Sequence, residues 1–353
     1  MNVNRLRGMA VASGRRTFRA LPIRYRSRLR TLTEQRLGSK VELRRVALTQ
    51  QAPVGLRPAL APVVIEAPDE LFIPKALIKR GLVGYEPFAL ETFLAVLEAA
   101  GPGAVLDIGG NVGLYGLLAC AHGGREVHSF EPTPLVAAAA RRSAAVSDLR
   151  LHVHEVAVGD GVGPATLYIS DTSDASNSLN PTFRRHVQEV VVPGTTVDAF
   201  VAKRRIAPAV IKIDTESTEA AVLRGARTTI ERHRPWILLE VLPARSRGGE
   251  LDAAMTDLGY SYYPLRSAGR IEPVEHIEGA AGGADMYLLS PRPMRWPDWQ
   301  RVEGWRQALT GVTVTHEHVD VAARLLDDVL VTACRTGASQ PAAAAPARHP
   351  TPA

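Results

Sequence analysis

The sequence predicts an α/β protein with a mostly parallel β-sheet that carries helices on both faces. Short apolar runs bounded by turn residues recur along the chain, and each is typical of a buried strand. Amphipathic helical stretches separate most of these runs, and repeated strand–helix–strand order makes neighbouring strands parallel. The expected strands span residues 104–110, 126–131, 149–158, 209–214 and 236–241. Two later runs, 261–266 and 284–290, have no helix between them and indicate an antiparallel hairpin at the sheet edge.

A second hairpin is expected in the middle of the chain. Residues 165–170 and 189–193 are strand-like and flank a polar loop at 171–186. Loops at the carboxyl ends of parallel strands bind ligands in open α/β sheets. We therefore expect this hairpin to lie over the ligand-binding end of the sheet.

Composition excludes several classes of protein. The chain has 353 residues, of which 46% are hydrophobic and 22% charged, as in globular proteins with a buried core. No run approaches the roughly 18 apolar residues of a membrane span, and no apolar stretch of a signal peptide follows the basic N-terminus, so we expect a cytoplasmic protein. Two cysteines are too few for a disulfide framework or a thiolate zinc site. The His152/His154 and His316/His318 pairs lack further ligands, and no metal site is predicted.

Positive charge is concentrated at the N-terminus. Residues 1–45 contain 13 Arg and Lys against two Glu, so this arm carries +11 and the rest of the chain −5. Such an arm suits nucleic acid or another anionic surface, but it offers only two aromatic side chains for base stacking, which favours a solvated extension. A homodimer contact is another interpretation of the terminal segments. The expected divisions are a basic, partly helical arm (1–50), a linker (51–80), the main domain (81–292), a helical C-terminal extension (293–335) and a disordered Ala/Pro tail (336–353).

The strongest chemical signal is the segment LDIGGNVGLYG. A strand ends near Asp107, a tight turn containing Gly109, Gly110 and Gly113 follows, and a helix then begins. Glycines permit positive φ and close approach of the backbone to a ligand. The spacing differs from the G-x-G-x-x-G pattern that seats a pyrophosphate on a helix N-terminus. An acid directly before the turn would repel a pyrophosphate and suits a cationic ligand, such as the sulfonium and ammonium groups of S-adenosylmethionine.

Two further strand ends complete the predicted cofactor site. Glu131 ends the second strand, where a carboxylate can accept hydrogen bonds from both hydroxyls of an adenosine ribose. The third strand ends in EVAVGD, in a position to contact the adenine. The backbone at Ala157 would bond the ring, and Asp160 or Glu155 would accept from the exocyclic amine. Asp160 also fits an ordinary Gly-Asp-Gly turn.

Carboxylates gather at the ends of the fourth and fifth strands. Asp214 and Glu216 emerge at the ligand-binding edge, and Glu240 would face the same crevice from the next strand. Methyl transfer to an alcohol requires the hydroxyl to be oriented in line with the sulfonium and its proton to be removed, which a positioned carboxylate can do. These three residues are the catalytic candidates. Glu219 is better explained as a helix-capping acid. The absence of an Asn/Asp-Pro-Pro-aromatic pattern weakens N-methylation of a nucleobase and favours a hydroxyl acceptor.

The chain resembles the FkbM family of S-adenosylmethionine-dependent methyltransferases over roughly residues 84–290. The motifs that carry the resemblance are YEPFALETFLAVLEAAGPGAVLDIGGNVGLYG, SFEP, EVAVGDGVGPATLY, SNSL, TTVDAF, IKIDTESTEAAVLRGA and RPWILLEV. The resemblance implies a class I methyltransferase fold, a Rossmann-like three-layer sandwich whose seven-stranded sheet has an antiparallel last strand. It also implies S-adenosylmethionine as cofactor and O-methylation of hydroxyls on sugars, polyketides or other natural products.

The same resemblance assigns individual positions. Matching the family's cofactor motif are Asp107, Gly109, Asn111, Gly113 and Glu131. Asp214 and Glu216 match its acidic fourth-strand motif, whereas Ser217 stands where the family usually has glycine.

Three other functions compete with an O-methyltransferase acting on a small molecule or glycan. An RNA methyltransferase would use the basic arm to hold phosphates, and its affinity would fall steeply with salt. A nicotinamide-dependent dehydrogenase is disfavoured by the glycine spacing. A catalytically inactive scaffold would keep the cofactor pocket without turnover.

Overall fold

The computed structural model describes residues 40–50, 60–86, 88–242, 248–279 and 285–322. Most of the basic arm and all of the Ala/Pro tail therefore lie outside the described residues. Within these ranges, no helix has the length and apolar character needed to cross a membrane.

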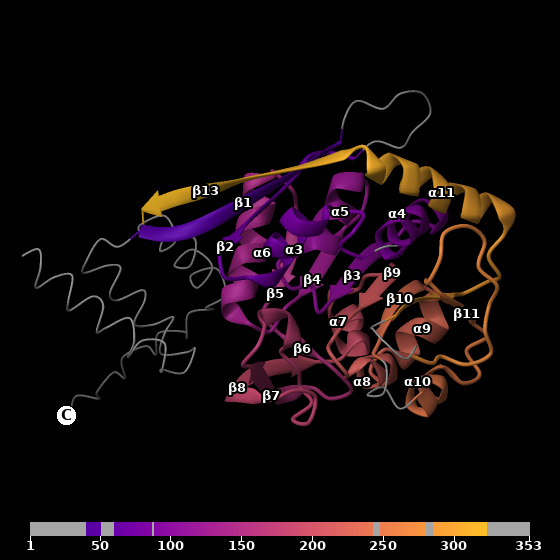
Figure 1. Cartoon of the computed structure of the whole chain (residues 1–353). Coiled ribbons are helices and arrows are strands. Elements are labelled where there is room, and N and C mark those ends of the chain that lie inside the picture. Colours follow the sequence, from indigo (N-terminus) through magenta and orange to yellow (C-terminus); the bar gives the residue numbers. More distant parts are fainter. Residues whose placement is uncertain (1–39, 51–59, 87, 243–247, 280–284, 323–353) are drawn as a thin grey trace, which may run out of the picture.

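A seven-stranded sheet forms the centre of the molecule (Figure 1). Its strands, in spatial order, are β11 (Ser261–Pro264), β12 (Asp285–Ser290), β10 (Trp236–Val241), β9 (Pro208–Ile213), β3 (Ala104–Ile108), β4 (Val127–Phe130) and β5 (Leu151–His154). All neighbours pair in parallel except β12, which runs antiparallel to both β10 and β11. The predicted mostly parallel sheet with a reversed last strand is confirmed, as is the pairing of the two late runs.

Helices cover both faces because successive strand residues point to opposite sides. In β3, Val105 packs into one apolar cluster and Leu106 into the other. The first cluster receives α4 (Ala89–Ala99), α5 (Leu114–His122) and α6 (Pro134–Val146). The second receives α7 (Val197–Arg204), α8 (Glu219–Arg224), α9 (Arg227–His233) and α10 (Gly248–Met255). The result is a three-layer sandwich.

The order of the strands places a ligand crevice at one edge. From β3 the chain builds outward through β4 and β5 on one side, and then returns to add β9 and β10 on the other. Such a reversal leaves a crevice at the carboxyl ends of the two central strands, where open α/β sheets bind ligands. The loops after β3, β4, β9 and β10 therefore set the composition of the site.

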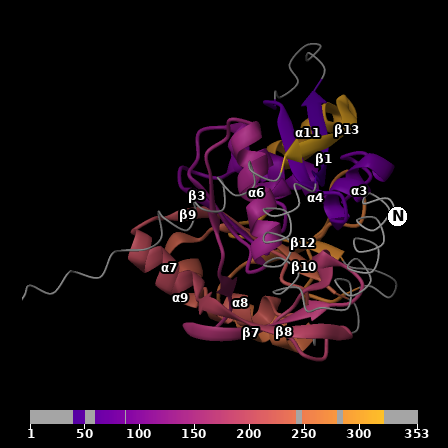
Figure 2. The ribbon, with the colours of Figure 1, turned by 90° about the vertical axis from the view of Figure 1, so that its left-hand side faces the viewer.

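The predicted central hairpin is also present. Strands β7 (Gly163–Ser170) and β8 (His186–Thr195) pair antiparallel, and β8 pairs with the short β6 (Ala157–Val158). Their connection contains the short helix η1 (Asp174–Ser176). Figures 1 and 2 both show this small sheet at the lower end of the molecule.

The segments flanking the main domain differ from the prediction. Strands β1 (Lys40–Gln50), β2 (Val63–Pro68) and β13 (Val312–Ala322) form a third sheet, with β1 in the middle. The predicted linker also contains helix α3 (Phe72–Arg80). Of the predicted helical extension, the described residues form helix α11 (Trp296–Thr310) and then strand β13. The reason is long-range pairing: β1 joins β13 along its whole length, some 270 residues away in sequence. Alternation such as Val-Thr-Val-Thr in β13 is the local signal of this strand.

Polar contacts attach the third sheet to the main domain. Buried Glu66 of β2 accepts hydrogen bonds from Arg45 of β1 and from Arg142 of α6. Ser143 of α6 and Ser147, the C-cap residue of that helix, accept from the backbone of β2 at 2.9 and 2.8 Å. These contacts position the following helix, α3, against the ligand-binding end of the sheet.

Candidate functional site

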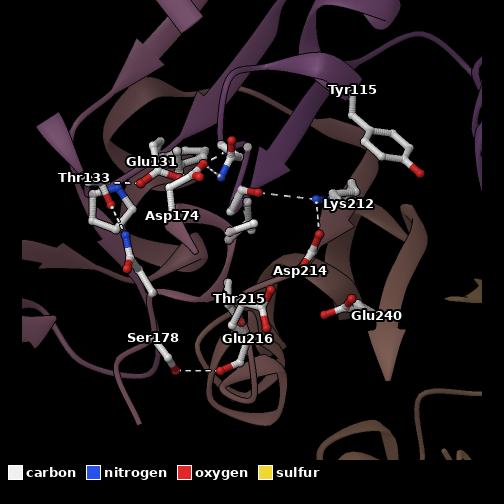
Figure 3. A pocket seen from close by; sticks show the side chains of 18 of the residues that line it. Tyr115, Glu131, Thr133, Asp174, Ser178, Lys212, Asp214, Thr215, Glu216 and Glu240 are labelled. Carbon is white, nitrogen blue, oxygen red and sulfur yellow. Dashed lines mark hydrogen bonds and ion pairs between the residues drawn. The ribbon is translucent and has the colours of Figure 1, made fainter. Parts of the chain in front are cut away.

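A cavity of about 350 Å³ opens at the carboxyl ends of β3, β4, β9 and β10. Its size is at the lower end of the range for small-molecule sites. The glycine turn, the strand ends, the β7–β8 connection and the segment from α3 to α4 all contribute to its lining. Figure 3 shows the acidic side chains that converge on it.

The turn after β3 depends on glycine at two positions. Gly109 has φ +73°, and a Cβ atom there would lie 1.6 Å from the carbonyl oxygen of Asp214. A Cβ on Gly110 would lie 1.9 Å from Ser129 Oγ. Without these side chains the turn fits closely against β4 and β9, and both glycine amides donate to the Phe130 carbonyl at 3.0 Å. Gly113, also at positive φ, begins α5.

Asp107 lies beneath this turn, and it does not line the cavity as predicted. The residue is fully buried, and its Oδ2 accepts from the Gly116 amide at 3.0 Å and from Ser129 Oγ at 3.2 Å. Burial raises the pKa of the carboxyl group, while Lys212 opposes that rise. Through Oδ2 the carboxylate therefore ties the start of α5 to β4, whereas its Oδ1 is buried without a hydrogen-bond partner. Because strand residues alternate, Asp107 points into a layer of the sandwich while the turn beyond it faces the cavity.

Glu131 lines the cavity where the sequence placed it. Its Oε1 accepts from the Thr133 amide at 2.7 Å and its Oε2 from the Asn111 amide at 3.2 Å. Burial raises its pKa to about 7, although these backbone donors oppose the rise. Asn111, at positive φ, also donates to Asp174 of η1 at 3.5 Å. Each carboxylate oxygen of Glu131 retains acceptor capacity for a ligand hydroxyl.

The predicted adenine contacts are only partly in place. Ala157 and its neighbour Val158 line the cavity. Asp160 does not: it forms an ion pair with Arg224 at 2.7 Å and is half exposed. Glu155 pairs with Arg141 on the surface. Both acids follow the strand end closely, where a complementary arginine on a nearby helix draws the side chain outward.

The three catalytic candidates come together at the ends of β9 and β10. One carboxylate oxygen from each of Asp214, Glu216 and Glu240 lies within 4.8 Å of the others. We call these three residues the acidic corner. Among the described residues they form the one group of His, Cys, Asp or Glu with the spacing of a metal site. Figure 3 shows Asp214 between Lys212 and the other two acids.

Lys212 forms an ion pair with Asp214 of the acidic corner. Its buried ammonium donates to Asp214 Oδ2 at 2.8 Å and to the Gly109 carbonyl at 3.3 Å. Burial opposes the charged form, but the surrounding carboxylates, above all Asp214, outweigh it and raise the pKa of Lys212. The ammonium also lies 5.1 Å from the centre of the Tyr115 ring. Lys212 therefore joins the glycine turn to the acidic corner.

The other two acids of the corner have strongly perturbed proton affinities. Burial, followed by the charge of Asp214, raises the pKa of Glu216 to about 8. The same two causes raise the pKa of Glu240 well above its ordinary range, and Glu240 Oε2 is buried without a hydrogen-bond partner. Glu219 instead accepts from the Thr215 and Ser217 amides, in agreement with its predicted capping role.

The loop after β9 keeps a glycine-like conformation without glycine. Ser217 has φ +82° and Glu216 has φ +56°. Ser178 Oγ donates to the Glu216 carbonyl at 2.6 Å, and Asn180 donates to Ser217 Oγ at 2.9 Å. Ser217 therefore adopts a strained backbone at the position where the family that the sequence resembles usually has glycine. Side chains of the β7–β8 connection hydrogen-bond to this strained segment.

Several residues of the site were not predicted. Lys212, Tyr115, Glu86 and Asp174 all line the cavity. The alternation Ile-Lys-Ile-Asp is a usable signal for Lys212, because residues two apart in a strand share a face. Asp174 lies in the polar loop expected over the site. Glu86 precedes α4 and carries no local signal, since its place depends on how α4 packs on α5.

One histidine of each pair considered in the sequence, His154 and His318, contacts neighbouring side chains. His128 contacts His154 at 3.0 Å and Glu126 at 2.9 Å on the face of the sheet covered by Phe200. His318 lies in β13 beside Arg44. Of the basic arm on which an RNA acceptor would depend, residues 1–45, only 40–45 are among the described residues, where they belong to β1.

Known proteins provide an independent comparison. The model of a family described as the methyltransferase FkbM domain matches residues 107–262. No curated protein shows significant similarity to the chain.

Similar solved structures are distant. An FkbM methyltransferase from Methylobacillus flagellatus is 18% identical, with a TM-score of 0.34 over 53% of this chain and 43% of that one. The chain thus matches less than half the length of that protein. A SAM-dependent methyltransferase from Agrobacterium tumefaciens is 14% identical, with a TM-score of 0.36 over 69% of this chain and 71% of that one. The 16S rRNA N2 G1207 methyltransferase of T. thermophilus, in complex with AdoMet and guanosine, is 13% identical, with a TM-score of 0.36 over 70% and 51%.

Proposed function

Since the chain belongs to the FkbM family of S-adenosylmethionine-dependent methyltransferases and has the class I methyltransferase fold, we propose that it methylates a hydroxyl oxygen of a small molecule or glycan. The observation that carries the choice of a hydroxyl is the acidic corner. Three carboxylates, two of them with raised pKa values, line the cavity next to the glycine turn. In its ionised form, a carboxylate with a raised pKa is a stronger base and can accept a proton from an alcohol.

The cavity residues fit the cofactor's chemistry. Glu131 would accept hydrogen bonds from the ribose hydroxyls, and the backbone at Ala157, which lines the cavity, would hold the base. The lining contains more carboxylates than cations, as a ligand with sulfonium and ammonium groups requires. When bound, S-adenosylmethionine supplies a methyl group on a positively charged sulfur, which an in-line oxygen can attack.

The acidic corner would carry out the acceptor's part of the reaction. Asp214, held by Lys212, accepts the hydrogen bond that aims the acceptor hydroxyl at the methyl carbon. As the new C–O bond forms and the C–S bond breaks, the hydroxyl proton would pass to Glu216 or Glu240. The electrons of the broken bond would leave with sulfur, so the transfer would need no oxidant or reductant. Positioning and proton removal together are the usual contribution of an enzyme to such a transfer.

Methyl-labelled cofactor tests this proposal directly. The protein would be incubated with ¹³C-methyl S-adenosylmethionine and a panel of glycosides and polyketides, and the labelled product located by mass spectrometry and NMR. We expect the label on oxygen. Glu216→Gln and Glu240→Gln should each lower kcat by roughly 10²-fold, whereas Glu231→Gln, on an exposed ion pair of α9, should not. A label on nitrogen or carbon, or full activity in both corner variants, would refute the proposal.

A further inference from the structure

Two carboxylates of the cavity, Asp174 and Glu86, have no part in the mechanism above, and Asp174 already accepts a hydrogen bond from Asn111. Glu86 lies between α3 and α4, and precedes the residues that match the family domain. Its side chain lines the cavity together with Tyr115 and Lys212. Burial raises the pKa of its carboxyl group, while Lys212 opposes that rise. A buried acid at the wall of a ligand cavity is costly unless a donor or a cation accompanies it.

Packing holds this carboxylate in a defined place. The Tyr115 hydroxyl donates a hydrogen bond to Glu86 Oε2. Tyr115 is the second residue of α5, and its ring packs edge-on against Phe93 of α4, with the ring centres 5.0 Å apart. Glu86 is therefore attached to the first turn of α5, just beyond the glycine turn.

The two ends of the glycine turn each carry an acid. Glu131 accepts from the Asn111 amide, and Glu86 accepts from Tyr115, four residues further on. If Glu131 binds the ribose, the amino-acid end of the cofactor extends along the turn toward Glu86. The N-cap residue of α5, Gly113, makes no side-chain cap, and a helix N-terminus favours a carboxylate. The α-ammonium beside that carboxylate then needs an acidic partner.

Asp107 lies beneath the turn and does not line the cavity, although its Oδ1 is buried without a hydrogen-bond partner, whereas Glu86 is at the cavity wall. The acidic corner is assigned to the acceptor. We propose that Glu86 binds the α-ammonium group of the cofactor's amino-acid end, with Tyr115 holding its carboxylate in position. This inference rests on the proposed function, and it transfers to Glu86 the cation-binding role that the sequence suggested for Asp107.

Calorimetric binding of two cofactor fragments tests the assignment without any acceptor. S-adenosylhomocysteine keeps the α-ammonium and α-carboxylate, whereas 5′-methylthioadenosine lacks the amino-acid end. Glu86→Gln should weaken binding of S-adenosylhomocysteine by roughly 10- to 100-fold, the effect of losing a hydrogen bond to a charged group. It should leave the affinity for 5′-methylthioadenosine unchanged within about twofold, an allowance for the neutral amide that replaces the acid.

Two variants control for structural effects. Glu91→Gln makes the same change at a buried acid of α4 that does not line the cavity, and should alter neither affinity. Tyr115→Phe removes only the hydroxyl that holds Glu86, and should weaken S-adenosylhomocysteine alone, by less than Glu86→Gln does.

The outcomes separate this inference from the proposed function. An equal loss of affinity for both fragments in Glu86→Gln would show that Glu86 only shapes the cavity, and no loss for either would show that it does not touch the ligand. Each result overturns the inference and leaves the proposed function standing. Failure of the unmodified protein to bind S-adenosylhomocysteine would overturn both.

Discussion

Replacing Lys212 with methionine should destabilise the protein and reveal how the carboxylates around it depend on one cation. The side chain of Lys212 is only 3% exposed and that of Asp214 21%, with 2.8 Å between their charged atoms. Methionine has a similar length and no charge, so it fills the same space. The change leaves a carboxylate beside the glycine turn without its partner.

The expected cost follows from this burial. Breaking a buried ion pair by removing one partner costs about 3–5 kcal/mol. Because Asp214 keeps some contact with water, we expect the lower end, about 3 kcal/mol. For a protein of this size that corresponds to a fall in Tm of roughly 4–6 °C. Adding Asp214→Asn to the lysine variant should recover part of the loss, since the uncompensated charge is then removed.

Urea unfolding of the two single variants and the double variant at pH 5, 7 and 8.5 provides the assay. Without the ammonium, the folded-state pKa values of nearby carboxylates rise further above their unfolded values. A raised folded pKa stabilises below the unfolded pKa, and this stabilisation is lost as pH increases through the folded pKa. The deficit of Lys212→Met should therefore be larger at pH 8.5 than at pH 5. A deficit below about 1 kcal/mol, or one independent of both pH and Asp214, would contradict this interpretation.

Three other outcomes follow from the same geometry. In the unmodified protein, the free energy of unfolding should decline from pH 5 to pH 8.5, because burial raises the folded pKa of Glu216 to about 8; Glu216→Gln should flatten this decline in denaturant titrations. Gly109→Ala should lower the free energy of unfolding by roughly 3 kcal/mol, because of the positive φ and the contact of the added Cβ with Asp214. Gly101→Ala, whose added Cβ meets no atom within 4 Å, should leave the Tm in thermal melts unchanged. Methyl transfer should persist in EDTA, because Lys212 already supplies a cation to the acidic corner; a loss restored by Mg²⁺ would show that the three carboxylates work through a metal.

The central sheet could be predicted from the sequence because its signals are local. Apolar runs such as 209–214, separated by helical stretches, indicate parallel strands, and the hairpins follow from strand-like runs around polar loops. The third sheet could not be predicted in the same way. Residues 40–50 find their partner in 312–322, so the decisive contact spans most of the chain. Without that distant partner, the sequence of this arginine-rich strand predicts a solvated extension.

The positions of the acidic side chains at the site could be predicted from the motifs only in part. Sequence placed Asp107, Glu131 and Asp160 together because each ends a strand of the same sheet. In the structure, a backbone amide and a hydroxyl donate to Oδ2 of Asp107 beneath the turn. Asp160 forms an ion pair with an arginine at the surface, and Glu131 lines the cavity. The three acids differ in the hydrogen-bond donor that lies beside each one, and that donor comes from a different element in each case.

The same reasoning explains why the charge that balances a cationic ligand need not come from the motif itself. Electrostatic attraction depends on distance and burial, and not on position along the chain. Once Asp107 is committed to the backbone of α5, another carboxylate at the cavity wall can supply the negative charge, and Glu86 is held there by Tyr115 of that same helix. Asp107→Asn should then affect stability more than ligand affinity, and Glu86→Gln the reverse. Thermal melts and calorimetry on the two variants would show whether folding and cofactor recognition are divided between these acids.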